Sequence, residues 1–350
     1  MIQPTRTILS AAVLALLLGA CQRGEEATPA DPAPSTAADA QAPAVDADAD
    51  APATAATHNP YCSGEPGTAP SGELVAQRIP AANGDGANGL YEGPVWNGEA
   101  LYFSDFRFSE GFPSRIRRLG ADGSMQTVIE DSGSNGLALG SDGAIVAATH
   151  DRKELSRYDP ADGSRMRIVG EFEGQPFNSP NDLVIGSDGT IWFTDPDFQR
   201  AAAPGGQPKT RVYRVGSDGR VSVVDDSIAN PNGIALAPDG RTLYVAGGGE
   251  QGVLRAYPLD AAGQPGPGRD LARTHVPDGL AIDCLGNIYL TEHERRRVRV
   301  LSPAGEDLAT IKVDANVTNA AFGGPQRRTL YITGAGTVWS LELDVAGLPY

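Results

Sequence analysis

The sequence has little of the chemistry that most hydrolases use. Its 350 residues include only four histidines and three cysteines. It contains no G-x-S-x-G nucleophile motif, no H-E-x-x-H zinc motif and no Walker phosphate-binding loop. These absences argue against a serine hydrolase with a nucleophile elbow, a zinc protease or a P-loop nucleotidase. Any catalytic group must therefore come from other residues.

Long hydrophobic runs are also missing. The apolar stretch from Ile8 to Leu18 is too short to span a membrane but suits a secretory signal, and Arg6 precedes it. We therefore predict that residues 1–20 form a signal peptide. The segment Leu18-Gly19-Ala20-Cys21 resembles the lipobox of bacterial lipoproteins, which implies cleavage before Cys21 and lipidation of that cysteine. The alternative is an ordinary exported protein in which Cys21 lies at the cleavage site by chance.

Within the lipobox resemblance, Gln22 after the cysteine favours an outer-membrane protein that faces the periplasm. Residues 21–58 are rich in Ala, Pro, Asp and Thr, so we expect them to form a disordered tether. The formal net charge of −16 argues against a nucleic-acid partner. Contact with a membrane is expected only through the lipid, and the oligomeric state is left open.

Residues 60–350 show no helical periodicity and repeat one pattern six times. In each repeat a polar residue precedes a short apolar strand, and a second strand rich in aromatic or β-branched residues follows. The polar residues are spaced 43, 46, 51, 46 and 41 residues apart; they are Glu92, Asn135, Asn181, Asn232, Asp278 and Asn319. Repeats of this length, built from short strands and turns, are typical of propeller blades. We therefore expect an all-β, six-bladed β-propeller, with the N-terminal strand Glu73–Ile79 closing the last blade.

The repeated polar residues predict a cation site. The innermost strands of a propeller line its central channel, so equivalent residues converge on the axis. One Glu, one Asp and four Asn offer only oxygen ligands, which Ca²⁺ prefers. The alternative is that Asn and Asp recur simply because turns recur. Of the two ionisable members, Glu92 and Asp278, either could act as general base or nucleophile.

The remaining cysteines and histidines give two further expectations. If Cys21 carries lipid, Cys62 and Cys284 form an even pair in an oxidising compartment, which predicts a disulfide; the alternative is two unpaired thiols. His150 and His293 end aromatic strands and could face the channel mouth. A packed or solvated imidazole is the more usual state of such residues, so a catalytic role for His293 is the less favoured interpretation.

The motifs as a set resemble one family. They occur one to a blade and in order: Glu92-Gly93-Pro94-Val95-Trp96, Ser179-Pro180-Asn181-Asp182-Leu183, Pro231-Asn232-Gly233-Ile234-Ala235 and Pro277-Asp278-Gly279-Leu280 among them. This order is similar to that of the gluconolactonase, regucalcin and senescence-marker-protein family of lactone hydrolases. The resemblance implies a six-bladed propeller, one divalent cation on the axis and hydrolysis of lactones.

The resemblance also implies roles for individual residues. The metal ligands would be Glu92, Asn181, Asn232 and Asp278, with Asp278 also the acid/base. The cation would be Ca²⁺, with Zn²⁺, Mn²⁺ or Mg²⁺ as alternatives. Residues expected to line the channel or the substrate mouth are Asn135, Asn178, Asp195, His293 and Asn319.

Two departures from the family pattern concern the substrate. Phe177 stands near a place where bacterial gluconolactonases often have Arg, which predicts a more apolar mouth, and blade two has Thr149-His150-Asp151 in place of Glu-His-Gly. The first interpretation is a lactonase or related esterase acting on a small lactone or ester. One alternative is a phosphotriesterase or arylesterase with the same cation, as in the similar diisopropylfluorophosphatases and paraoxonases. The other is a surface binding propeller whose cation is structural.

Overall fold

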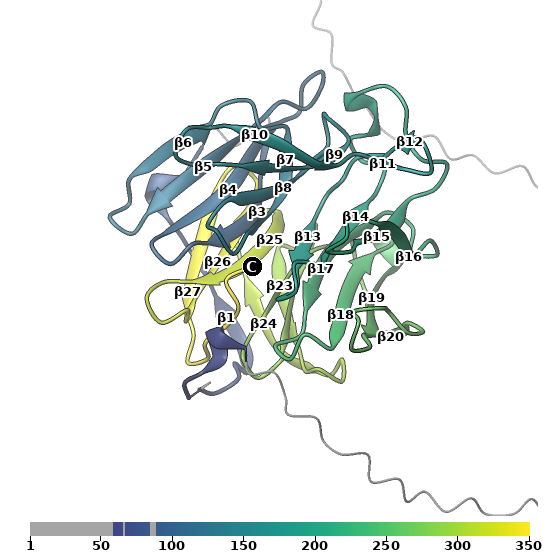
Figure 1. Ribbon diagram of the computed structural model, residues 1–350. Coiled ribbons are helices and arrows are strands. Elements are labelled where there is room, and N and C mark those ends of the chain that lie inside the picture. The colour runs from purple at the N-terminus through teal and green to yellow at the C-terminus, as the bar shows by residue number, and fades with distance from the viewer. Residues whose placement is uncertain (1–58, 66, 85–88) are drawn as a thin grey trace, which may run out of the picture. The chain divides into compact units, whose positions relative to one another are not determined.

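The computed structural model describes residues 59–65, 67–84 and 89–350, and these form a six-bladed β-propeller (Figure 1). The expected signal peptide, the tether and Cys21 lie outside the described residues. None of the helices in the described part of the chain is long and apolar enough to cross a bilayer.

Each blade is an antiparallel sheet whose strands follow one another in sequence from the channel outward. Blade one contains β3 (Gly89–Trp96), β4 (Ala100–Arg107), β5 (Ser114–Gly120) and β6 (Met125–Ile129). Blade two contains β7 (Ser134–Leu139), β8 (Ile145–Thr149), β9 (Glu154–Tyr158) and β10 (Arg165–Val169). Blade three contains β13 (Leu183–Ile185), β14 (Ile191–Asp195), β15 (Arg211–Val215) and β16 (Val221–Asp225). A small hairpin, β11 (Glu171–Phe172) and β12 (Gln175–Pro176), lies between blades two and three in the sequence.

The other three blades follow the same plan. Blade four contains β17 (Pro231–Leu236), β18 (Thr242–Gly247), β19 (Gly252–Pro258) and β20 (Arg269–Thr274). Blade five contains β21 (Pro277–Ile282), β22 (Ile288–Glu292), β23 (Arg297–Leu301) and β24 (Asp307–Lys312). Blade six contains β25 (Val317–Gly323), β26 (Thr329–Gly334) and β27 (Val338–Glu342). The short helices η1 (Pro60–Cys62), η2 (Pro80–Ala82), η3 (Arg200–Ala202) and η4 (Gly249–Gln251) lie outside the sheets.

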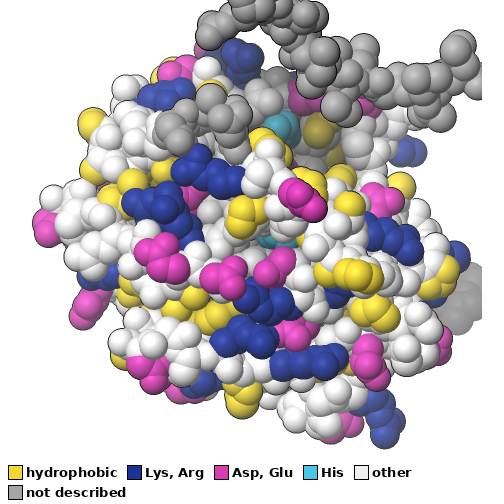
Figure 2. All heavy atoms as spheres, turned by 90° about the horizontal axis from the view of Figure 1, so that it is seen from above, with side chains coloured by type: hydrophobic (Ala, Val, Ile, Leu, Met, Phe, Trp, Pro, Cys, Tyr) yellow, Lys and Arg dark blue, Asp and Glu magenta, His cyan; other side chains and the backbone are white. Residues whose placement is uncertain are grey.

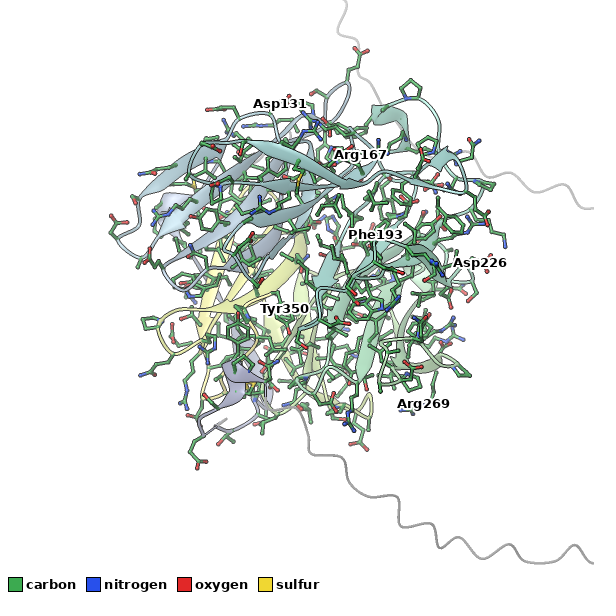
Figure 3. All side chains as sticks on the ribbon, in the orientation of Figure 1. Asp131, Arg167, Phe193, Asp226, Arg269 and Tyr350 are labelled. Atoms are coloured by element: carbon green, nitrogen blue, oxygen red, sulfur yellow. A yellow bond between two sulfur atoms is a disulfide. The ribbon has the colours of Figure 1, made fainter. Side chains whose placement is uncertain are left out.

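The aromatic strands of the sequence repeat are the second strands of the blades, and their large side chains fill the spaces between sheets. Phe193 of blade three, labelled in Figure 3, is fully buried and packs against Phe177 and Tyr213, with ring centroids 4.9 and 5.3 Å away. Burial of such rings is the main source of stability in a fold of short strands. The predicted six-bladed propeller is therefore confirmed.

Closure of the ring is confirmed, but the N-terminal segment does more than was expected. Strand β2 (Gln77–Arg78) pairs antiparallel with β27 and becomes the outer strand of blade six. Strand β1 (Gly72–Val75) instead adds a fifth, parallel strand to β24 of blade five. The single predicted strand Glu73–Ile79 is thus two short strands that join neighbouring blades, and the seam is held on both sides.

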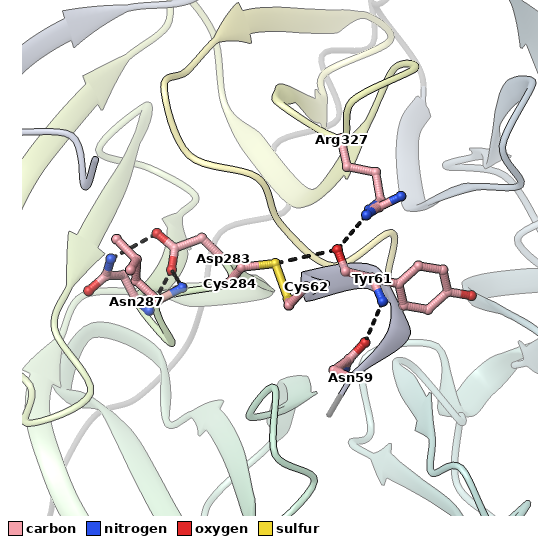
Figure 4. Close-up of a disulfide and its surroundings, with 8 residues drawn as sticks. Asn59, Tyr61, Cys62, Asp283, Cys284, Asn287 and Arg327 are labelled. Atoms are coloured by element: carbon pink, nitrogen blue, oxygen red, sulfur yellow. Dashed lines mark hydrogen bonds between the residues drawn. A yellow bond between two sulfur atoms is a disulfide. The ribbon is translucent and has the colours of Figure 1, made fainter. Parts of the chain in front are cut away.

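A disulfide links Cys62 to Cys284, with their Cα atoms 5.4 Å apart (Figure 4). Cys62 ends η1, and Cys284 lies in the turn between β21 and β22. Arg327 donates a hydrogen bond to the carbonyl of Tyr61 and stacks over its ring. The disulfide therefore fixes the start of the N-terminal segment to blade five, just before the strands that close the ring.

The C-terminal tail crosses one end of the channel, and Tyr350 lies near the centre of Figures 1 and 3. The tail bonds to the C-terminal ends of three inner strands. Leu348 donates to the carbonyl of Ile282 and accepts from Phe322, and Pro349 accepts from Trp96. A cavity of about 1040 Å³ on this face is lined by Tyr350, by the same ends of other inner strands and by adjoining turns. None of the six repeated polar residues lines that cavity.

Charged side chains of both signs are interspersed on the face shown in Figure 2. Ion pairs also form within the blades. In blade two, the buried Glu154 pairs with Arg165 and with Arg167. Asp142 at the Asp-Gly turn accepts the backbone N–H of Ala144 and pairs with Arg157. These pairs join β9 to β10 and to the turn between β7 and β8.

Candidate metal centre and active site

The repeated polar residues lie at bulges in the inner strands. In blade four, Pro231 pairs with Gly247 and Ile234 with Val245, so Asn232 and Gly233 face a single residue of β18. The same two-against-one shift occurs in β3, β7, β21 and β25. Bulges re-aim side chains and are common beside active sites. In blades two, four and five the polar residue and the glycine after it form the bulge, which the sequence alone did not reveal. In blade one the bulge is Gly93-Pro94, directly after Glu92, and in blade six it is Thr318-Asn319.

In blade three the repeated polar residue Asn181 lies before the regular inner strand and not within it. Its inner strand β13 begins only at Leu183, after Asn181 and Asp182. The N–H of Asn181 donates to the carbonyl of Thr194, and the N–H of Thr194 donates to the carbonyl of Asp182. These two residues thus stay tied to β14 although they precede the regular strand.

We call the six repeated polar residues around the channel the ring residues. Two of them, Glu92 and Asp278, lie close to a third carboxylate, Asp182. Glu92, Asp182 and Asp278 are each less than 9% exposed. Asn319 donates a hydrogen bond to Asp182, 3.2 Å away, from the opposite side of the propeller. Asn319 also bonds to Glu92, and Asn232 to Asp278. Four of the six predicted ring residues therefore form one polar cluster with Asp182.

Burial and mutual repulsion raise the pKa values of these carboxyl groups. The pKa of Glu92 lies well above its usual range because of burial and then of the charges on Asp278 and Asp182. Burial raises the pKa of Asp182 to about 7, against the hydrogen bonds from Leu183 and Asn319. Burial also raises the pKa of Asp278, while His293 opposes the rise. The protein by itself therefore favours the protonated forms of these carboxyl groups.

His293 lies beside Asp278. Its Nδ1 is 2.6 Å from the carbonyl oxygen of Val317 and 3.3 Å from Oδ2 of Asp278. Both partners are acceptors, so Nδ1 carries a proton, and this proton is shared between the two oxygens. Burial would lower the pKa of His293, but Asp278 and Val317 outweigh it and raise the pKa. The imidazole therefore orients the Asp278 carboxylate.

Asn135 and Asn181 are buried members of the ring in neighbouring blades. The carbonyl of Asn181 accepts the N–H of Gly136 at 2.6 Å, which brings the two inner strands into direct contact. The side-chain Oδ1 of Asn135 is buried and has no hydrogen-bond partner among the described residues. A buried acceptor in this state is costly unless a ligand, ion or water satisfies it.

Asn178 and Asp195 hold the segment that leads to Asn181. Both are fully buried, and the Asp195 carboxylate accepts the N–H groups of Asn178 and Ser179 at 2.8–2.9 Å. Lys153 donates to the carbonyl of Asn178 from the other side, at 2.6 Å. Burial raises the pKa of Asp195 to about 7. Their contacts are thus to backbone and fix the loop ahead of the ring.

The expectation that Phe177 makes the mouth apolar is wrong. Phe177 is fully buried in the core of blade three, where its ring packs against Phe193 and Tyr213. An aromatic side chain next to a loop can fill a core as readily as line a mouth, and the sequence does not distinguish the two.

The sequence missed Asp182 as a member of the cluster. The residue after the ring position is Gly93, Gly136, Gly233 or Gly279 in four other blades and Ala320 in blade six. A charged residue where the other blades have a small one was the available signal. The strand register also shifts blade six by one residue, because Thr318 occupies the place of Asp278, and Asn319 that of Gly279. Asn319 therefore lies level with Asp182, which explains their contact.

The donor set fits a hard divalent cation. Among the described residues, no group of three or more His, Cys, Asp or Glu side chains is placed to hold a metal ion. The ring instead mixes carboxylate with amide oxygens, which is the chemistry that Ca²⁺ accepts. The unpartnered Oδ1 of Asn135 and the raised pKa values of Glu92, Asp182 and Asp278 are deficits that a cation would relieve.

Comparison with known proteins places this geometry in a family. Residues 90–336 match the model of the SMP-30/Gluconolactonase/LRE-like region. A gluconolactonase from Zymomonas mobilis is 30% identical over 291 residues, which cover 73% of this chain and 79% of that protein. A 6-deoxy-6-sulfogluconolactonase from Pseudomonas putida is 30% identical over 256 residues, 70% of this chain and 83% of that one.

A solved structure agrees with the sequence comparisons. A gluconolactonase from Xanthomonas campestris has a TM-score of 0.66 and 29% identity, and the match covers 79% of this chain and 99% of that one. The family match covers most of the propeller and all six ring residues. The chain belongs to the SMP-30/gluconolactonase/LRE-like family.

Proposed function

We propose that the protein is a divalent-cation-dependent lactonase. The observation that carries the proposal is the buried cluster of Glu92, Asp278, Asn232 and Asn319 at the inner-strand bulges, in a chain whose relatives include a gluconolactonase and a sulfogluconolactonase. Lactones need no nucleophile motif, because water can attack an activated carbonyl. The absence of the familiar hydrolase motifs is then consistent with an enzyme.

Residues of the ring would hold the cation. Glu92 and Asp278 supply charge, and Asn181 and Asn232 supply neutral oxygens; a bound cation would polarise the lactone carbonyl as a Lewis acid. Ca²⁺ is the ion that this oxygen-only set favours, and Zn²⁺ is disfavoured because no Cys or His belongs to the set.

Asp278 would move the proton. As water adds to the carbonyl carbon, the Asp278 carboxylate accepts its proton; as the ring C–O bond breaks, the proton passes to the leaving oxygen and gives a hydroxy acid. His293 keeps the carboxylate in place through the 3.3 Å contact from Nδ1 to Oδ2. The role of Asp278 thus rests on its burial and on its partner.

We further propose that the protein is exported and lipid-anchored at Cys21 in the outer membrane, facing the periplasm. The Cys62–Cys284 disulfide supports an oxidising compartment, because disulfides persist there and are rare in the cytosol.

The test of the catalytic role is the Asp278→Asn variant, which keeps the size of the side chain and removes the base. We expect kcat for lactone hydrolysis to fall by about 10²-fold or more, the usual contribution of a positioned general base. Asp283→Asn is the matched control, since Asp283 is a fully buried aspartate whose carboxylate bonds to Asn287 and Tyr289 in blade five and not to the ring. Wild-type turnover by Asp278→Asn would remove Asp278 from the mechanism.

A further inference from the structure

Three buried hydroxyl groups occupy equivalent places in the odd-numbered blades. Ser104, Thr194 and Thr291 are each the fourth residue of the aromatic strand motif, on β4, β14 and β22. All three are fully buried. In blades two and four the same place is taken by Ala148 and Ala246, which carry no hydroxyl. In blade six it is taken by Thr333, whose Oγ1 lies 3.0 Å from Oγ1 of Thr318 and so bonds within its own blade.

Each hydroxyl donates a hydrogen bond to a backbone carbonyl in the inner strand of the next blade, at or beside a ring residue. Ser104 Oγ donates to the carbonyl of Asn135 at 2.6 Å, and Thr194 Oγ1 donates to the carbonyl of Asn232 at 2.7 Å. Thr291 Oγ1 donates to the carbonyl of Thr318 at 2.7 Å, next to Asn319. The acceptors are thus the peptides that carry or adjoin ring side chains, in blades two, four and six.

Thr194 also bonds within its own blade. Its Oγ1 accepts the N–H of Asp182 at 3.1 Å while it donates to Asn232. One hydroxyl therefore joins the ring segments of blades three and four. Thr291 differs, because both of its neighbours are acceptors: its Oγ1 lies 2.7 Å from the carbonyl of Thr318 and 3.0 Å from that of Gly279, and its one proton is donated to either, with the shorter contact to Thr318.

The boundaries from even to odd blades use no such hydroxyl from the second strand. Between blades two and three, the N–H of Gly136 donates directly to the carbonyl of Asn181. Between blades four and five, a Cβ on Gly233 would lie 2.2 Å from the carbonyl oxygen of Asp278, so only glycine allows this approach. Between blades six and one the link comes from an inner strand, because Thr318 Oγ1 of β25 donates to the carbonyl of Tyr91 at 2.5 Å. Hydroxyls of the second strands thus link blade one to two, three to four and five to six.

We propose that Ser104, Thr194 and Thr291 are positioning residues for the cation site. The inference rests on the proposed function, because it takes the ring as the place where the cation binds. A bulge has lost part of its ladder hydrogen bonding, so its peptides need other partners to keep one orientation. The hydroxyl fixes the peptide, and the peptide fixes the side chain it carries. The Thr194 hydroxyl acts one step away from Asn232, a proposed ligand, and removing a partner of this kind commonly changes metal affinity by about 10–100-fold.

The test compares two threonine-to-valine variants that differ in where the hydroxyl bonds. Thr194→Val removes the link to Asn232. Thr149→Val is the control, because Thr149 is also fully buried on a second strand but its Oγ1 bonds to the carbonyl of Glu154, 2.8 Å away in its own blade. Ca²⁺ binding to the chelator-stripped protein is measured by titration calorimetry, with thermal unfolding as the measure of stability.

We expect both variants to lose thermal stability, and Thr194→Val alone to bind Ca²⁺ about tenfold more weakly. Thr194→Ser, which keeps the hydroxyl, should return the affinity to within twofold of wild type, and Thr291→Val should weaken it as Thr194→Val does. Equal affinities for Thr194→Val and Thr149→Val would overturn the positioning role while leaving the lactonase proposal intact. A wild-type protein that takes up no Ca²⁺ would overturn the metal-dependent function and this inference with it.

Discussion

The Cys62–Cys284 disulfide gives a quantitative prediction, because it closes blades one to four and the first strand of blade five into one loop. The two cysteines are 222 residues apart in the sequence. The loss of chain entropy in the unfolded state predicts a stabilisation of about 5 kcal/mol for a loop of that length. Removing the bond should therefore lower the free energy of unfolding by up to about 5 kcal/mol, since native strain and residual structure reduce the effect.

The expected change in melting temperature follows from the size of the body. At about 2.1 cal/mol/K of unfolding entropy per residue, roughly 290 residues give about 0.6 kcal/mol/K, so 5 kcal/mol corresponds to about 8 °C. The effect should appear first at the seam, because β1 and β2 begin shortly after Cys62. Amides of β1, β2 and the edge of β27 should lose protection from hydrogen exchange, while the inner strands keep theirs.

The assay is scanning calorimetry of the oxidised wild type, of Cys62→Ser, of Cys284→Ser and of the double variant. All three variants remove the same bond, so they should melt together rather than show additive losses. Adding a reductant should move only the wild type. A double variant that melts within 1 °C of the oxidised wild type, or exchange that is unchanged at β1 and β2, would show that the disulfide does not hold the seam.

Three further predictions concern the ring and the anchor. Glu92→Gln should weaken Ca²⁺ binding at least tenfold by titration calorimetry, since it removes one of the charges that would neutralise the cation; unchanged affinity would exclude Glu92 as a ligand. Because Asp182 has a pKa of about 7 in the folded protein against about 4 unfolded, the folded state binds more protons between these values. The melting temperature of the protein in the presence of a chelator should thus fall as pH rises from about 4 to 7, and added Ca²⁺ should reduce that fall. A pH dependence that is the same with and without Ca²⁺ would contradict this prediction. Cys21→Ser should move the exported protein from the membrane fraction to the soluble fraction, and continued sedimentation with membranes would argue against the lipid.

The fold was predictable because the same sequence pattern occurs once in every blade. Each repeat carries a polar residue and an aromatic strand in the same order, and in five of the six a small residue follows the polar one, so six occurrences specify six blades. The way in which the N-terminal segment closes the propeller was harder to predict, because the sequence does not show that β1 and β2 are two short strands and not one. Which edge each strand pairs with depends on distant segments, β24 and β27.

The site was predictable at the level of residue type and less so at the level of register. Glu92, Asn232 and Asp278 were found because they recur at one position. The alignment put Asn319 with them, but the pairing of β25 with β26 places it one residue further along, opposite Asp182. A bulge adds a residue that pattern matching does not see, because its position is fixed by the hydrogen bonds of the neighbouring strand. The prediction that Phe177 lines the mouth was wrong for a related reason, because the burial of a side chain depends on the distant residues that pack against it.

The most direct test of the account is hydrolysis of a panel of lactones, including glucono-δ-lactone and an aliphatic γ-lactone, by the purified protein. Each reaction is followed as prepared, after treatment with a chelator, and after Ca²⁺ is added back. The account predicts activity that disappears with the chelator and returns with the metal, and the preferred lactone would then define the substrate. Activity that the chelator leaves unchanged would contradict the role of the cation. A folded, Ca²⁺-loaded protein that hydrolyses none of the lactones would contradict the lactonase assignment, and phosphotriesters and aryl esters would be assayed next.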